Sequence, residues 1–295
     1  MLPVGLFVAV LVLAACVFGA SRGRRAAGLV VVACAIPLPW WSDPAWPVAR
    51  AFLALGVILA VLRSIDLVRM RDRGWGPARR FAHIVSLVDT RRLVRRAPRF
   101  EFGSLAAALG WAAAVAGGVV IVTRVAPTRH GAEFWLLRWS GALVVIYAGA
   151  DAAQALAHAL YAAVGFESPP MHRTPAMARS IKEFWGERWN LAVSLWLREH
   201  AMRPLVARAG VSTGVAAAFA ASAVVHAYLA TAAAGWRMGL LMGGFFVVQG
   251  LWVILELRVG VARWAPWVAR CWSIGLMVAV SPMFLEPLLR GVGLR

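Results

Sequence analysis

The first side chain that could do chemistry is a histidine inside an apolar run. His226 ends the segment Ser222-Ala-Val-Val-His226 and is followed by Ala227. A buried imidazole is expected to stay neutral, because desolvation disfavours its charged form, and a neutral imidazole can accept a proton from a hydroxyl. Ser222 lies one turn earlier on the same face of a helix, where it could orient the ring. A histidine inside a membrane span can equally be a packing residue or part of a proton relay.

A second set of polar side chains lies in another apolar run. Tyr147, Asp151, Gln154 and His158 follow one another at steps of four, three and four, so they share one face of a helix. Polar groups inside a span are costly and usually line a cavity. The same pattern also arises where the end of a helix emerges into water. We therefore expect either a tunnel lining or an exposed helix end.

Between these runs lies a less apolar stretch, residues 169–205, which reads PPMHRTPAMARSIKEFWGERWNLAVSLWLREHAMRPL. Ser180 and Glu183 match a capping box, which predicts that a helix begins there. One side of a continuous helix would carry Ile181, Trp185, Trp189, Ala192 and Trp196, and the other Glu183, Glu187, Asn190, Ser194 and Arg198. Tryptophans suit the boundary between membrane and water, and the polar side suits a wet cavity. The pattern predicts an amphipathic helix at the membrane surface.

The motif in this stretch resembles that of a known family. Ser180-Ile-Lys-Glu-Phe-Trp-Gly-Glu-Arg-Trp-Asn190 is similar to S-x-x-[DE]-F-W-G-x-R-W-N, the signature of the wax synthase-like branch of the membrane-bound O-acyltransferase superfamily. That family has a second landmark some tens of residues later, a histidine in an apolar helix, and Ser222 to His226 fill its place. Ala227 stands where the family often has an acid. The resemblance covers roughly residues 169–230.

The resemblance implies an O-acyltransferase that uses acyl-CoA as co-substrate and needs no other cofactor and no metal. His226 would be the general base that deprotonates an acceptor alcohol, and the Asn190 amide would donate to the oxyanion. The acceptor would be a long-chain alcohol or a similar lipophilic hydroxyl compound. The expected substrate-binding or tunnel residues are Trp185, Glu183, Arg188, Trp189, Ser222, Asp151, Gln154 and His158.

The composition excludes an ordinary soluble domain. Of the 295 residues, 61% are hydrophobic and 15% are charged, whereas soluble domains contain about 45–50% apolar residues. The net charge of +18 comes almost wholly from arginines in the gaps between apolar runs. Positive residues at the cytoplasmic ends of spans and contacts with membrane lipids explain this charge, so we expect no nucleic-acid partner. The 3 cysteines show no ligand spacing, which predicts neither a disulfide framework nor a metal site.

The apolar runs predict one all-α domain over residues 1–295, a polytopic integral membrane protein of about eight transmembrane helices with interfacial amphipathic helices. The expected blocks are N-terminal spans 2–62, a basic cytoplasmic segment 63–103, spans 104–165, the motif region 169–205 and spans 212–290. The individual spans are Leu2 to Ala20, Ala26 to Trp41, Ala45 to Leu62, Ser104 to Val122, Phe134 to Gly165, Ser212 to Ala234, Trp236 to Leu257 and Trp267 to Phe284.

Arginine-rich gaps at 22–25, 63–99, 173–208 and 258–270 fall on one side of this topology. The positive-inside rule then places the motif region on the cytoplasmic side of the plasma (inner) membrane and both chain ends outside. The basic segment could also attract the phosphates of coenzyme A.

Three other functions fit the same pattern. An enzyme of this class could acetylate a glycan or a natural product, since the shape of the pocket decides the acyl length and the acceptor. A multipass transporter could use Tyr147, Asp151, Gln154 and His158 as a relay. A membrane scaffold could use the motif helix only to dock on the bilayer. The sequence does not determine the oligomeric state.

Overall fold

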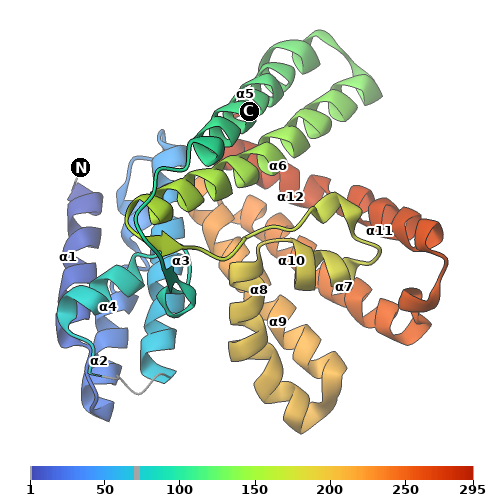
Figure 1. Cartoon of the computed structure of the whole chain (residues 1–295). Coiled ribbons are helices and arrows are strands. Elements are labelled where there is room, and N and C mark those ends of the chain that lie inside the picture. The colour runs from blue at the N-terminus through green and yellow to red at the C-terminus, as the bar shows by residue number, and fades with distance from the viewer. Residues whose placement is uncertain (1, 70–73, 295) are drawn as a thin grey trace.

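The computed structural model describes residues 2–69 and 74–294, and most of them are helical (Figure 1). The α-helices are α1 (Leu2–Val17), α2 (Arg22–Ala33), α3 (Pro47–Arg69), α4 (Pro77–Ile84), α5 (Phe102–Val120), α6 (Gly131–Ala163), α7 (Ile181–Glu183), α8 (Leu191–Leu197), α9 (Arg203–Ala234), α10 (Trp236–Val259), α11 (Pro266–Val280) and α12 (Pro282–Gly291). Two-residue strands β1 (Val94–Arg95) and β2 (Phe166–Glu167) pair antiparallel. The prediction of an all-α polytopic membrane fold is confirmed.

Shorter helical turns connect these elements. The 3₁₀ turns are Leu38–Trp41, Thr90–Arg92, Ala126–Thr128, Pro175–Met177 and Val261–Arg263, and the π-helical turns are Ile121–Val125, Phe184–Arg188 and Arg198–Met202. The basic segment predicted at 63–103 contains residues 70–73, which lie outside the described residues.

The number of spans is smaller than the eight expected. In the described chain, five helices are long and apolar enough to cross a membrane, and α11 with α12, bent by 49°, makes a sixth if the pair is one span. A membrane core of about 30 Å needs about 20 helical residues. Helix α1 has only 16 residues and α2 only 12, because the chain turns at the Gly19–Ser21 link and again before Pro37. The first two predicted spans are therefore short helices.

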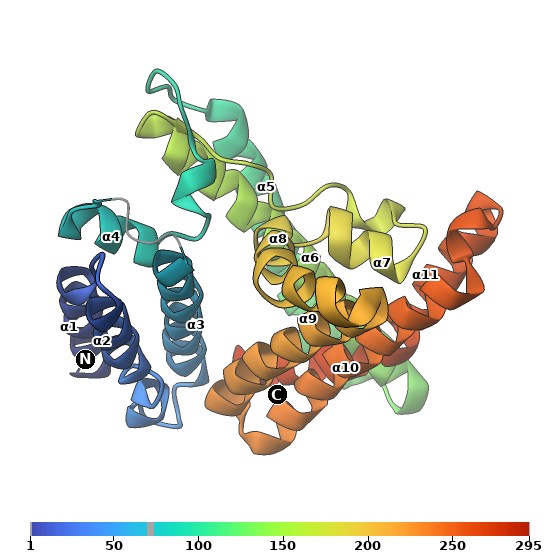
Figure 2. The ribbon, with the colours of Figure 1, turned by 90° about the horizontal axis from the view of Figure 1, so that it is seen from below.

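Helices α1 to α4 form a group on one side of the molecule, with α3 nearest to the rest (Figure 2). Phe18, Val32 and Ile84 are fully buried in the apolar core of this group. A buried charge cluster docks the group to the motif region: Asp66 of α3 receives a hydrogen bond from Arg63 (3.2 Å), and His200 Nε2 lies 2.7 Å from its Oδ1. A buried carboxylate is tolerated when it is paired in this way.

Helices α5 and α6 pack side by side as a long hairpin that projects from the body (Figure 1). The close contact depends on small residues, since a Cβ added at Gly118 would lie 2.9 Å from the carbonyl oxygen of Gly141. Arg138 of α6 is buried and donates to Glu286 of α12 at 3.1 and 3.3 Å. This ion pair joins α6 of the hairpin to α12 within an otherwise apolar contact.

Helices α9 and α10 make the most extensive helix contact in the described chain. The backbone of α9 is interrupted at Gly210, whose φ of 84° is left-handed and suits glycine. The predicted span from Ser212 therefore begins directly after a kink. His226 and Ser222 lie on the long straight part that follows it.

Two of the arginine-rich gaps, 63–99 and 173–208, lie together in the structure. The β1–β2 pair brings the chain before α5 to the chain after α6, and Trp196 Nε1 donates to the carbonyl oxygen of Leu62 (3.2 Å). At the opposite end, Pro47, Gly235 and Arg290 line one cavity. This arrangement agrees with the predicted partition of arginines, and the assignment of the cytoplasmic side stays a prediction.

Candidate active site

The motif region is a broken helix rather than the continuous amphipathic helix that the sequence predicted. Helix α7 passes into the π-helical turn Phe184–Arg188, the backbone becomes extended at Trp189, and α8 begins at Leu191. The break occurs because Asn190 adopts left-handed dihedrals (φ 43°, ψ 59°), which no helix interior accommodates. The two expected faces are therefore not aligned along a single axis.

Two side chains hold the start of the motif region. Ser180 Oγ accepts from the Glu183 N–H at 2.9 Å, so the predicted N-cap is confirmed. The Glu183 carboxylate instead accepts from the N–H of Arg179 (2.8 Å), one residue earlier than a capping box would have it. Glu256 of α10 accepts from the N–H groups of Ile181 (2.8 Å) and Lys182 (3.0 Å). The first turn is thus tied to the C-terminal end of α10.

Asn190 is held from both sides. Its Oδ1 accepts from the Val193 N–H (3.4 Å) as the N-cap of α8, and its own N–H donates to His172 Nδ1 (3.2 Å). Burial lowers the pKa of His172, which favours the neutral ring whose Nδ1 can accept. The ring of His172 also packs on Trp189, with centroids 4.7 Å apart. Because the side-chain oxygen is used as a cap, the amide NH₂ group is the part of Asn190 left for a ligand.

His226 has a defined tautomer. Its Nδ1 lies 2.8 Å from the carbonyl oxygen of Ser222 and 3.3 Å from Ser222 Oγ. A carbonyl oxygen only accepts, so Nδ1 carries the proton in this contact and Nε2 keeps its lone pair. The ring stacks on Phe246 of α10 with centroids 3.9 Å apart. Ser222 therefore orients the imidazole as expected, mainly through its backbone carbonyl.

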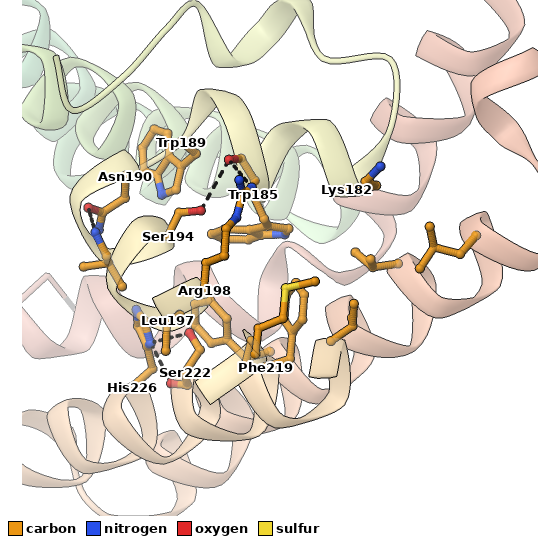
Figure 3. Close-up of a pocket in the computed structure, with 18 of the residues that line it drawn as sticks. Lys182, Trp185, Trp189, Asn190, Ser194, Leu197, Arg198, Phe219, Ser222 and His226 are labelled. Atoms are coloured by element: carbon orange, nitrogen blue, oxygen red, sulfur yellow. Dashed lines mark hydrogen bonds between the residues drawn. The ribbon is translucent and has the colours of Figure 1, made fainter. Parts of the chain in front are cut away.

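A cavity of about 340 Å³ brings these residues together (Figure 3). It is lined by five of the expected site residues, Trp185, Trp189, Asn190, Ser222 and His226. Two basic residues that the sequence analysis did not select, Lys182 and Arg198, also line it. Arg198 donates to the carbonyl oxygen of Gly186 at 3.3 Å. The cavity thus joins an apolar chamber, an imidazole and an amide to two positive charges.

Comparison with known proteins identifies a family match that covers most of the residues that line this cavity. Residues 168–248 match the Membrane bound O-acyl transferase family, and this range contains Asn190, Ser222 and His226. This part of the chain is therefore similar to the membrane-bound O-acyltransferases. The chain is 30% identical over 154 residues to a probable long-chain-alcohol O-fatty-acyltransferase of Arabidopsis thaliana, a stretch that covers 44% of this chain and 43% of that protein. It is 31% identical over 153 residues to the long-chain-alcohol O-fatty-acyltransferase of Simmondsia chinensis, covering 45% and 42%.

These alignments span less than half of each relative's length. The family match, residues 168–248, covers the motif region, α9 and the first half of α10, which together supply most of the cavity lining.

Glu183 and Arg188 of the O-acyltransferase motif pair with each other outside the cavity. Arg188 Nε donates to Glu183 Oε1 at 2.6 Å, and its Nη1 donates to the carbonyl oxygens of Arg173 (3.2 Å) and Thr174 (3.3 Å). Burial alone would raise the pKa of the Glu183 carboxyl, but the bonds from the Arg179 N–H and from Arg188 outweigh burial and lower it. Both residues fasten the loop before the motif, so they position the cavity wall.

The polar stripe of α6 lies away from His226. Asp151, Gln154 and His158 line a separate cavity of about 480 Å³, and Tyr147 lines a third, apolar one. Gln154 Oε1 accepts from the N–H groups of Met171 and His172, both at 2.7 Å. Gln154 thus anchors the loop that carries His172, and this stripe does not form a continuous lining with the His226 cavity.

Gln249 and Glu256 are site-supporting residues that the motif did not identify. Gln249 is fully buried and its Oε1 accepts from Trp185 Nε1 at 3.0 Å, which fixes the indole that forms one wall. Their sequence signal was available, because both are polar residues seven positions apart inside the apolar run of α10.

Most described arginines of the basic segment are engaged within the protein. Arg91 pairs with Asp89 (2.7 Å), Arg96 with Glu167 (2.9 Å) and Arg99 with Glu101 (2.5 Å). Arg79 lies 4.2 Å from the ring centre of Trp75. These charges have structural partners, which weakens the expectation that this segment captures coenzyme A.

Proposed function

We propose that the protein is an O-acyltransferase that moves an acyl group from acyl-CoA to the hydroxyl of a lipophilic acceptor such as a long-chain alcohol. The observation that carries the proposal is the single cavity that holds both His226 and the amide of Asn190. The printed names of the relatives, which are long-chain-alcohol O-fatty-acyltransferases, support the choice of substrate class.

The chemistry assigns one role to each group. His226 Nε2 takes the hydroxyl proton as the alcohol oxygen bonds to the thioester carbonyl carbon. The Asn190 amide donates to the oxyanion that forms on the carbonyl oxygen. The C–S bond then breaks, the ester leaves, and the thiolate recovers the proton from His226. The step balances without a covalent enzyme intermediate, and the carbonyl of Ser222 holds the imidazole in the tautomer required.

The cavity lining supports acyl-CoA as the donor. Lys182 and Arg198 line the cavity beside apolar residues of α9 and α10. Guanidinium and ammonium groups bind phosphates, whereas the apolar wall suits a hydrocarbon chain. Lys182 and Arg198 are therefore better candidates than the basic segment for binding the phosphates of coenzyme A. We assign them to the cytoplasmic side of the inner membrane, where coenzyme A is available.

The alternatives receive less support. Acetylation of a glycan or natural product would use the same two groups, and the apolar chamber favours a longer chain. A relay through the α6 stripe would need Tyr147 to share a path with Asp151 and His158, but they line different cavities.

The test is acyl transfer by the purified protein in nanodiscs, with labelled acyl-CoA, a panel of alcohols and analysis of the lipid products. We expect ester formation, and we expect His226→Ala to lower kcat about 10²–10⁴-fold, the typical cost of losing a general base. His130→Ala is the matched control, since His130 is exposed in the α5–α6 turn. Near-normal turnover in His226→Ala would contradict the mechanism.

A further inference from the structure

A cavity lined in part by two arginines lies at the end of the molecule opposite the motif region. It has a volume of about 450 Å³ and is lined by Pro44, Pro47, Arg50, Ala233, Ala234, Gly235 and Arg290. Three elements far apart in the sequence meet there: the start of α3, the α9–α10 turn and the end of α12. Nothing in the acyl-transfer mechanism uses this cavity, because His226 lies about two turns of α9 away from Ala233.

The cavity carries a positive charge that the protein only partly neutralises. Within the described residues, Arg50 Nε is buried and makes no hydrogen bond. Arg290 donates to Glu286 (2.9 Å), but the same carboxylate also accepts from Arg138 (3.1 Å). One carboxylate is thus shared by two guanidinium groups. A buried donor without a partner is costly, so the site is suited to an anion.

The backbone adds to the same charge. Helix α10 begins directly at the cavity, and its N-cap, Gly235, has no side chain that could cap the first N–H groups. The start of α3 at Pro47 lies at the same cavity. The positive ends of two long helix dipoles therefore supplement the two arginines.

Exposed tryptophans place this cavity at the level of the lipid headgroups. Trp46 is 67% exposed beside α3, and Trp236 is 63% exposed at the start of α10. Trp41, in the turn before α3, is 61% exposed. Tryptophans with such exposure on a membrane protein typically lie at the interface between hydrocarbon and water. At this level of the membrane, the phosphate groups next to Arg50 are those of lipid headgroups.

We propose that this cavity binds the phosphate of an anionic phospholipid headgroup between Arg50 and Arg290. Planar guanidinium groups match phosphate oxygens in a bidentate geometry. The bound lipid would bridge α3, which belongs to the N-terminal helix group, and α9, α10 and α12, which carry or support the site. It would therefore stabilise the contact between the two parts of the molecule.

The test measures lipid binding and thermal unfolding of the full chain in detergent, with phosphatidylglycerol, phosphatidylcholine or inorganic phosphate added. We expect phosphatidylglycerol to bind in native mass spectra and to raise Tm, with a smaller effect of phosphatidylcholine and none of phosphate. Arg50→Gln should weaken phosphatidylglycerol binding about tenfold, as expected for the loss of a charge-assisted hydrogen bond.

Arg50→Gln is the decisive variant because it breaks no ion pair of the described structure, whereas Arg290→Gln also releases Glu286. The charge-matched control is Arg129→Gln, at an exposed arginine of the α5–α6 turn. Equal phosphatidylglycerol binding by Arg50→Gln and the parent protein would overturn the proposal. A Tm increase by inorganic phosphate as large as that by the lipid would overturn the assignment to a lipid in favour of a soluble anion.

Discussion

At the scale of single residues, Asn190 has two functions that different substitutions can separate. Its left-handed backbone and its role as N-cap of α8 stabilise the motif, and its NH₂ group is the proposed oxyanion donor. Alanine tolerates neither the positive φ nor the cap, and the loss of such a cap costs about 1 kcal/mol. Asn190→Ala is therefore expected to destabilise the motif and cannot isolate the chemical role of the side chain.

Asn190→Gly isolates the chemical role. Glycine accepts a positive φ and costs only a few tenths of a kcal/mol as an N-cap. We expect its Tm to stay near that of the parent protein while kcat falls about 10²–10³-fold, the usual cost of one oxyanion donor. The measurement is kcat for acyl transfer in nanodiscs beside thermal unfolding. A Tm loss in Asn190→Gly as large as in Asn190→Ala, with unchanged kcat, would reduce the residue to a cap.

Combining this change with His226→Ala tests whether the two groups act as one unit. Groups that stabilise the same transition state give effects that do not multiply. The double variant should therefore be only slightly slower than His226→Ala alone. If the fold-losses in kcat of the two single variants multiply in the double variant, Asn190 acts at a step that does not need His226.

At the scale of elements, the motif is held in place by α10. Glu256 accepts from two backbone N–H groups of the motif, and Gln249 accepts from Trp185. In Glu256→Gln, an NH₂ group replaces one of the two acceptor oxygens and faces a backbone N–H group, so one hydrogen bond is lost. A hydrogen bond to a charged group contributes about 1.5–3 kcal/mol to the free energy of unfolding. We expect a lower Tm and a KM for acyl-CoA that rises more than kcat falls, because Lys182 moves with the first turn. Glu133→Gln, at an exposed site on α6, is the control.

The same elements show what a sequence can and cannot predict. The apolar runs located the helices, and the motif selected Asn190 and His226, because both signals are local. The helical period did not predict the break at Asn190, because it assumes a continuous helix. The break depends partly on a contact with His172, which is distant in the sequence. The helical period correctly placed Asp151, Gln154 and His158 on one face of α6. The period could not predict which cavity these side chains line, because the loop from Glu167 to Met171 forms the other wall. Such contacts depend on tertiary packing.

At the scale of the whole molecule, the charges define two different ends. One end holds the motif region, Lys182, Arg198 and the arginines that pair with Asp89, Glu101 and Glu167. The other end holds fewer arginines, with Arg50 and Arg290 at a cavity surrounded by exposed tryptophans. Arginines that are paired within the folded protein still help to determine the orientation of the chain in the membrane, because the positive-inside rule acts before the chain folds. The first end is therefore expected to be cytoplasmic.

This orientation determines where each substrate must enter, and reporter fusions test it. Fusions at Pro98 and Arg263 should read cytoplasmic, as should one at Arg73, which lies outside the described residues. Fusions at Pro127 and Gly235 should read on the opposite side, since an α-helical span separates each from the arginine-rich end. Coenzyme A would then reach Lys182 and Arg198 directly from the cytoplasm, whereas the acceptor alcohol would arrive through the bilayer. Inverted readings at all four described positions would move the cavity mouth away from the supply of coenzyme A and exclude cytoplasmic acyl-CoA as the donor.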